Sequence, residues 1–305
     1  MKVIIIGNQK FGESVLQKFY EETDHTVVAV LCEQDIIGKP IDPIKKYAEN
    51  YKIPFFQPKN YKDKKLLNQI KSLKPDISVM AYVTSFIPKE FREIPKKGTV
   101  CFHPSLLPMH RGPSAINWPI ILGSAETGLT MFYPNDRLDE GDIILQKKVS
   151  ISPNDTLGDV YFSKIFPLGV NACLEAVDLI NSGNVPKIIQ DDSKATYESW
   201  CKKSDSKINW NKTGQEIYNL IRGCNPQPGA WTNIENNEYI FYDTYFEVGK
   251  NTKYLPGQII SIKKNEITIA TNEGTLKVSR IKSKQGKLYI KEMDTSVFKV
   301  GDIFA

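Results

Sequence analysis

The residues with the greatest capacity for chemistry gather between positions 99 and 147 of the chain. His103 closes a strand-like apolar run, Val100–His103, and Pro104 ends that strand because proline cannot donate to a ladder. His103 therefore lies where a predicted strand passes into a loop, which is where open α/β sheets usually carry their chemistry. A second turn, Leu138–Asp142, is acidic and precedes another predicted strand, Ile143–Gln146.

The loop after His103 is predicted to be bent and non-helical. Leu107-Pro108 and Arg111-Gly112-Pro113 both contain residues that interrupt helices. Ser114 is then expected to N-cap a short helix that carries Asn117. Together the turns and the helix offer an imidazole, a carboxylate and a side-chain amide at one edge of a sheet.

These residues carry a resemblance to a known family. The sequence His-Pro-Ser-Leu-Leu-Pro-x-x-Arg-Gly at 103–112, followed by Asp139-x-Gly141-Asp142, resembles the signature of the 10-formyltetrahydrofolate-dependent formyltransferases. That family includes methionyl-tRNA formyltransferase, glycinamide ribonucleotide formyltransferase, the sugar N-formyltransferases and the hydrolase domain of 10-formyltetrahydrofolate dehydrogenase. The resemblance implies that 10-formyltetrahydrofolate is the formyl donor and that His103 and Asp142 are the catalytic histidine and aspartate.

A formyl group on N10 of folate is a stable amide, so its transfer needs help at three points. The nucleophile must lose a proton, the tetrahedral oxyanion needs a positive partner, and N10 must be protonated before it leaves. A histidine can bind the oxyanion as imidazolium, and a neighbouring carboxylate favours that charged form. Asp142 is expected to hold His103 in this way or to relay a proton through a water molecule. No metal is needed.

The residue two positions before this histidine departs from the family pattern. Most transferases of the family read Asn-x-His, and the amide helps to bind the oxyanion, whereas this chain reads Cys101-Phe102-His103. The dehydrogenase's hydrolase domain also lacks that asparagine, and its loop resembles residues 103–118 closely. Loss of an oxyanion donor costs on the order of 10²–10³ in rate in other enzymes. The substitution therefore favours formyl release over amine formylation.

Cys101 itself has three interpretations. It is a small buried hydrophobe, a nucleophile that takes the formyl group, or a donor that replaces the amide. The first is favoured, because nothing nearby except His103 would make the side chain a thiolate.

The resemblance also implies that the loop after the predicted strand Asp76–Tyr82 lines a folate pocket, with the turn at 134–137 opposite it. The alternative is ordinary loop packing. The residues expected to bind folate are Tyr82, Ser85, Phe86, Ile87, Leu106, Asn135, Asp136, Leu138 and Asp139.

Three further polar residues are candidates for an acceptor site. His110 and Arg111 could steer anionic folate or acceptor groups, although Arg111 could equally pair with an acid structurally. Asn117 could place an amide near the pocket, and capping or turn bonding is the alternative.

Composition sets the class of protein. A chain of 305 residues suggests about two domains, and 41% hydrophobic with 25% charged residues is typical of a globular protein. Five scattered cysteines and three histidines show no metal-binding spacing, so neither a zinc site nor a disulfide framework is expected. The opening apolar run is too short for a signal peptide, and no run approaches about 18 apolar residues. A cytoplasmic protein with reduced thiols and no membrane contact is expected.

The first part of the chain alternates strand and helix patterns. Val3–Ile6 followed by a helix at Glu13–Tyr20 is typical of a doubly wound α/β fold. The turn between them, Gly7–Gly12, lacks Gly-x-Gly-x-x-Gly, so no NAD is expected. The pattern continues to a helix at Thr156–Asn181. We expect a Rossmann-like formyltransferase domain at 1–185 and, in a polar stretch of low periodicity, a linker at 186–206.

A second domain is expected at 207–305. A helix around Gly214–Arg222 is followed by alternating strands, which predicts a small antiparallel β-barrel. By resemblance this is the oligonucleotide-fold-like C-terminal domain of the family. The predicted strands are Tyr239–Tyr242, Gln258–Ile262, Glu266–Ala270, Thr275–Val278 and Leu288–Ile290.

The segment Lys277–Lys291 carries six basic residues and no acidic one. It could follow the phosphate backbone of a tRNA, or it could be a solvated face. Two functions therefore follow from the resemblance. The favoured one is 10-formyltetrahydrofolate hydrolase-like release of the formyl group to water or an unidentified acceptor. The alternative is formylation of methionyl-tRNA, with sugars or other amines as further acceptors.

Overall fold

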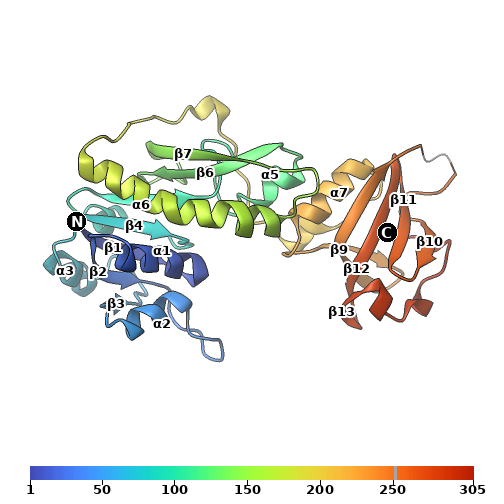
Figure 1. Ribbon diagram of the computed structural model, residues 1–305, viewed down its shortest axis with the longest axis horizontal. Coiled ribbons are helices and arrows are strands. Elements are labelled where there is room, and N and C mark those ends of the chain that lie inside the picture. Colours follow the sequence, from blue (N-terminus) through green and yellow to red (C-terminus); the bar gives the residue numbers. More distant parts are fainter. Residues whose placement is uncertain (251–252) are drawn as a thin grey trace. The chain divides into compact units, whose positions relative to one another are not determined.

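The computed structural model describes residues 1–250 and 253–305 (Figure 1). The chain forms two compact units, and each is built from several segments. The first unit comprises Met1–Arg111, Gly128–Lys148 and Lys164–Tyr197. The second comprises Gly112–Thr127, Val149–Ser163 and Glu198–Ala305. The domain limits at 185 and 207 remain a prediction. No helix among the described residues is long and apolar enough to cross a membrane.

A seven-stranded sheet forms the centre of the first unit, in the order β3-β2-β1-β4-β5-β6-β7. Strands β1 to β5 pair in parallel, and β6 runs antiparallel to β5. The strands are β1 (Lys2–Gly7), β2 (Thr26–Leu31), β3 (Phe55–Phe56), β4 (Ile77–Ala81), β5 (Thr99–His103), β6 (Glu126–Phe132) and β7 (Ile143–Ser150). The central strands β1 and β4 are apolar and buried almost throughout, as expected where helices cover both faces of a parallel sheet. The doubly wound α/β prediction is confirmed.

Helices connect the parallel strands (Figure 1). They are α1 (Gln9–Glu21), α2 (Pro43–Asn50), α3 (Lys64–Ser72) and α4 (Lys89–Arg92), whereas α6 (Phe166–Ser182) follows β7, the last strand of the sheet along the chain. Asp63 caps α3, because its carboxylate accepts from the backbone N–H of Leu66 at 2.9 Å. Ile4 and Ile6, which share one face of β1, pack in a buried cluster with Ile70 of α3 and Phe91 of α4.

Two predicted helix starts were wrong. Ser114 does not cap α5 (Asn117–Ile121): it has a φ of +59°, and its hydroxyl accepts from the backbone N–H of Cys201. Residues 159–165 form a π-helix before α6 begins at Phe166. Pro167 has no N–H to donate to the carbonyl four residues earlier, so an ordinary α-helix cannot pass unchanged through this point.

The second unit contains a small antiparallel sheet, as predicted. Its ladder has the order β10-β11-β12-β9-β8, with β13 also paired to β12. Its elements are α7 (Gly214–Gly223), β8 (Ala230–Ile234), β9 (Asn237–Val248), β10 (Ile259–Lys263), β11 (Glu266–Thr271), β12 (Gly274–Ser283) and β13 (Gly286–Tyr289). Trp210, Phe241 and Phe304 lie in its core, and the rings of Trp210 and Phe304 stack with centroids 6.1 Å apart.

Candidate active site

His103 is the last residue of β5, at the end of the sheet where the parallel strands finish. The loops after β1 and β4 meet at the same end, since the side-chain amide of Asn8 donates to the carbonyl of Tyr82 at 3.1 Å. β1 and β4 are the neighbours at which the strand order reverses. Open α/β sheets bind their ligands in the crevice beyond such a point.

The imidazole of His103 contacts a carboxylate from the acidic turn. Its Nδ1 lies 3.6 Å from Oδ2 of Asp139, and the ring is buried at 6% exposure. Its Nε2 lies 2.8 Å from the carbonyl oxygen of His110. A carbonyl oxygen can only accept, so Nε2 carries a proton and donates it there. Nδ1 is therefore the nitrogen available for chemistry beside Asp139.

The other aspartate of the turn has a different partner. The carboxylate of Asp142 lies 3.5 Å from Nζ of Lys187, and its backbone carbonyl accepts from the N–H of Tyr133. The structure thus places the carboxylate of Asp139, and not that of the predicted Asp142, against the imidazole of His103. We therefore propose Asp139 as the catalytic carboxylate.

Gly141 explains why this turn can lie so close to the sheet. A Cβ at this position would lie 1.5 Å from the carbonyl oxygen of Tyr133. Any residue but glycine would force the turn away from β6, and Asp139 would move with it.

Cys101 packs among apolar side chains. It contacts the buried cluster of Leu107, Phe132 and Ile143. Burial, and then the charge of Asp139, raise the pKa of its thiol well above the ordinary value. The geometry therefore favours the hydrophobe over the nucleophile, because a neutral thiol is a poor nucleophile.

The two loops expected to bind folate are joined by a residue that the sequence did not indicate, Arg92. Its guanidinium is 8% exposed, donates to the carbonyl of Ile87 at 2.9 Å, and also bonds the carbonyl of Pro134 and the carboxylate of Asp136. Five charge-assisted donors in a fixed fork suit such a role. Arg92 thereby fixes the spacing between the loop after β4 and the turn at 134–137.

The remaining residues expected at the pocket differ in exposure. Phe86 and Leu138 are 65% and 56% exposed, and Tyr82 is also exposed, with a φ of +64°. Asn135 and Asp136 are exposed, and Ser85 is exposed beside Phe86. Ile87 and Leu106 are buried. Solvent-facing apolar groups on both loops are what a flat aromatic ligand requires.

Arg111 is engaged within the protein. Its guanidinium is 1% exposed and forms ion pairs with Asp192 at 2.7 Å and Glu140 at 3.4 Å. It also bonds Gln190 and the hydroxyl of Tyr197. The geometry supports the structural alternative for Arg111. His110, at φ +58°, holds His103 through its carbonyl and bonds Thr196 through its N–H.

Asn117 belongs to the second unit. Its amide donates to the carbonyls of Gly223 and Gln227 at 2.9 and 3.2 Å. These bonds match the turn-bonding alternative, in which Asn117 holds the end of α7.

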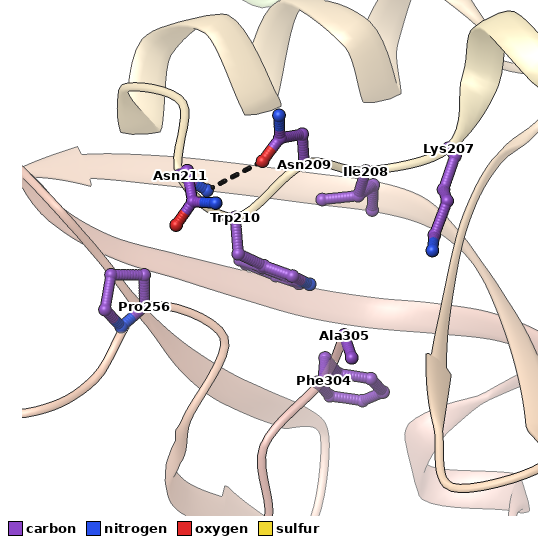
Figure 2. Close-up of a pocket in the computed structure, with 8 residues that line it drawn as sticks. All are labelled: Lys207, Ile208, Asn209, Trp210, Asn211, Pro256, Phe304 and Ala305. Carbon is purple, nitrogen blue, oxygen red and sulfur yellow. Dashed lines mark hydrogen bonds between the residues drawn. The ribbon is translucent and has the colours of Figure 1, made fainter.

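A pocket of about 520 Å³ also lies in the second unit (Figure 2). Trp210 and Phe304 form its apolar floor, and Asn209 accepts from the backbone N–H of Asn211 beside it. None of the residues predicted to act on the formyl group or to bind folate lines it.

Comparison with known proteins places the chain in a family. Residues 1–176 match the formyl transferase family, and residues 201–296 match the formyl transferase C-terminal domain. The chain belongs to the formyl transferase family and is an enzyme of that family.

Individual relatives share about a third of its residues. The cytosolic 10-formyltetrahydrofolate dehydrogenase of Xenopus laevis is 35% identical over 322 residues, covering 99% of this chain and 35% of that protein. This chain thus spans about a third of the length of that relative. The methionyl-tRNA formyltransferase of Fusobacterium nucleatum is 34% identical over 293 residues, covering 94% of each protein.

Solved structures show the same fold. HypX from Aquifex aeolicus in complex with tetrahydrofolic acid matches with a TM-score of 0.67 and 18% identity, over 99% of this chain and 48% of that one. The N-formyltransferase from Helicobacter canadensis matches with a TM-score of 0.66 and 19% identity, over 94% and 100%.

Proposed function

We propose that this enzyme removes the formyl group from 10-formyltetrahydrofolate, in the manner of a 10-formyltetrahydrofolate hydrolase. The contact between His103 and Asp139, at the sheet end where the folate loops meet, carries the proposal. The folate donor is supported by the names of the dehydrogenase relative and of the HypX complex. The cytosolic location in the relative's name supports the expected cytoplasmic location.

In the proposed reaction, water attacks the formyl carbon and its proton passes to the carboxylate of Asp139. The resulting oxyanion accepts a hydrogen bond from protonated Nδ1 of His103. The proton on Asp139 then passes to N10 as the carbon–N10 bond breaks. The products are tetrahydrofolate and formic acid, which loses its proton to solvent.

The experiment is incubation of the protein with 10-formyltetrahydrofolate alone, with a small thiol, and with charged initiator tRNA. Formate, formyl thioester and formylmethionine are then identified directly, and an amino-sugar nucleotide serves as a fourth acceptor. Formate as the main product under all conditions supports the hydrolase proposal. If a formylated acceptor forms at a much higher rate than formate, transfer to that acceptor replaces the hydrolase proposal.

Cys101 provides a test of the choice between water and amines. Cys101→Asn is expected to raise amine formylation relative to hydrolysis, because it restores an amide two residues from His103 on one face of β5. Cys101→Ala should leave hydrolysis within about twofold, since the neutral thiol performs no step. Product ratios by chromatography provide the measurement. Loss of hydrolysis in Cys101→Ala, with a formyl thioester trapped on the wild type, would identify Cys101 as a nucleophile.

Basic side chains of the hairpin formed by β12 and β13 favour methionyl-tRNA as a second candidate acceptor. Nζ of Lys287 lies 3.5 Å from the ring centre of Tyr242, a buried residue of β9, and the guanidinium of Arg280 lies 5.2 Å from the ring centre of the exposed Tyr289. Burial, and then the charge of Arg280, lower the pKa of Lys287, as expected where cations crowd together. A cluster of cations beside an exposed aromatic ring, that of Tyr289, suits a nucleic-acid backbone and its bases. The Fusobacterium relative, a methionyl-tRNA formyltransferase by name, adds support.

This second candidate predicts an effect of charge on tRNA binding. Replacing Lys282, Lys284 and Lys287 by alanine should weaken tRNA binding about 10- to 100-fold and flatten its salt dependence, because fewer counterions are released. Filter binding over a salt series measures both. The control is the same change at three exposed lysines of α3, Lys64, Lys65 and Lys71. Equal affinity in both triple variants would leave only the solvated-face interpretation.

A further inference from the structure

The segment 188–197, which the sequence suggested was part of a linker, contacts both the loop that follows His103 and the turn that carries Asp139. At one end Ile188 exchanges two backbone hydrogen bonds with Ile143, next to the acidic turn. At the other end the carbonyl of Thr196 accepts from Arg111, and the N–H of Thr196 donates to Pro108. We call residues 188–197 the crossing segment.

Gln190 is the residue of the crossing segment that contacts the acidic turn. Its amide nitrogen donates to the carbonyl oxygens of Asp139 and Gly141, both at 2.8 Å, and its side chain is buried at 8% exposure. Its amide oxygen accepts from Nε and Nη2 of Arg111, at 3.1 and 2.8 Å. The amide nitrogen donates two hydrogen bonds and the amide oxygen accepts two, so these contacts allow only one orientation of the side-chain amide.

Arg111 extends this network to the other catalytic group. It directly follows His110, whose carbonyl accepts from Nε2 of His103. Tyr197 closes the network, because its hydroxyl donates to Glu140 at 2.6 Å and contacts Arg111. The backbones that carry Asp139 and that orient His103 are therefore joined through one buried amide and one buried guanidinium.

We propose that Gln190 is a positioning residue that sets the place of Asp139 relative to Nδ1 of His103. The inference rests on the proposed formyl release. Gln190 touches neither substrate nor the reacting atoms in this account, and it acts through the backbone of the acidic turn. Displacements of about 1 Å at a catalytic group cost on the order of 10²-fold in rate. Loss of the two hydrogen bonds from Gln190 to the backbone of the acidic turn should therefore lower the rate.

Two variants separate positioning from folding. Gln190→Glu keeps the acceptors for Arg111 but directs a carboxylate oxygen at the carbonyls of Asp139 and Gly141, whereas Gln190→Leu removes both sets of bonds. Both are expected to lower kcat about 10- to 100-fold and to change KM for 10-formyltetrahydrofolate less than about threefold. Gln190→Glu should lose less stability than Gln190→Leu, because its carboxylate keeps the contacts with Arg111. Gln17→Leu, a half-buried glutamine of α1 bonded only to Glu21 among the contacts described, is the matched control.

A double variant tests whether Gln190 acts through Asp139. In an Asp139→Asn background, adding Gln190→Glu should lower kcat by less than about twofold, because the group that it positions is already disabled. If the two substitutions lower kcat independently, so that their fold-losses multiply, the proposal is wrong. So would a Gln190→Glu variant with wild-type kcat beside an inactive, poorly folded Gln190→Leu, since that combination describes a structural residue.

A spectroscopic test is independent of activity. The chain has only three histidines, so the ¹⁵N resonances of His103 can be assigned by their loss in His103→Ala. Gln190→Glu should move the Nδ1 resonance, which faces Asp139, and leave Nε2, which bonds His110, in place. An unmoved Nδ1, or equal movement of both nitrogens, would overturn the proposal. If the wild-type enzyme releases no tetrahydrofolate, the proposed function fails, and this spectrum alone decides the role of Gln190.

Discussion

His103→Ala and Asp139→Ala are each expected to lower kcat for formyl release by about 10²–10⁴-fold, the usual contribution of a positioned acid or base. KM for 10-formyltetrahydrofolate should change little, because the loops proposed to bind folate are held by Arg92 rather than by these two groups. Steady-state release of tetrahydrofolate measures both constants. A variant that keeps more than about a tenth of wild-type kcat, a loss below about 1.4 kcal/mol, would lose its catalytic assignment.

The comparison with Asp142→Ala makes this result decisive for the choice of carboxylate. Asp142 pairs with Lys187, so its removal should cost less than about tenfold. A larger loss in Asp142→Ala than in Asp139→Ala would return the catalytic role to Asp142, as the resemblance alone implied.

Arg111→Met is expected to destabilise the first unit by about 2–4 kcal/mol. The change removes one partner of buried, hydrogen-bonded ion pairs and leaves the amide oxygen of Gln190 without its donors. The expected loss of stability is smaller than the largest losses seen when a fully buried ion pair is broken, because the side chain of Asp192 is 68% exposed. Urea denaturation, monitored by fluorescence, measures the change in the free energy of unfolding.

Arg137→Met is the matched control for that experiment. Arg137 pairs with the same Glu140 at 3.2 Å, but its side chain is 74% exposed. Solvent screens such a pair, so the expected change is below about 1 kcal/mol. Similar destabilisation by both variants would show that burial of Arg111 contributes nothing to stability.

The fold was predictable where local signals agreed with tertiary packing. The buried runs of β1, β4 and β5 and the cap at Asp63 follow from residue types at short spacing. β6 and β8 were not predicted, because their polar and apolar residues do not alternate cleanly. The start of α5 was misplaced because Ser114 bonds Cys201, a partner 87 residues away that no local pattern reveals.

In the candidate site, too, residues marked by local sequence signals could be predicted, and residues held by long-range contacts could not. His103 could be identified from a strand end and a motif, since both are local. Which aspartate contacts the imidazole could not, because Asp139 and Asp142 lie three residues apart in one turn and have different partners. Arg92 and Gln190 were missed for a related reason: their partners lie 42 to 79 residues away in sequence. Polar residues in a stretch of low periodicity gave no sign that they were buried.

The position of the crossing segment has a consequence for the newly made chain. His103 and Asp139 leave the ribosome before Gln190, which follows Asp139 by 51 residues. The sheet can form from residues already synthesised, but the amide that ties the acidic turn to Arg111 arrives afterwards. On the proposed role of Gln190, catalytic competence is therefore a late event in biosynthesis. A nascent chain halted at residue 185 would display its reactive groups without the segment that fixes their geometry.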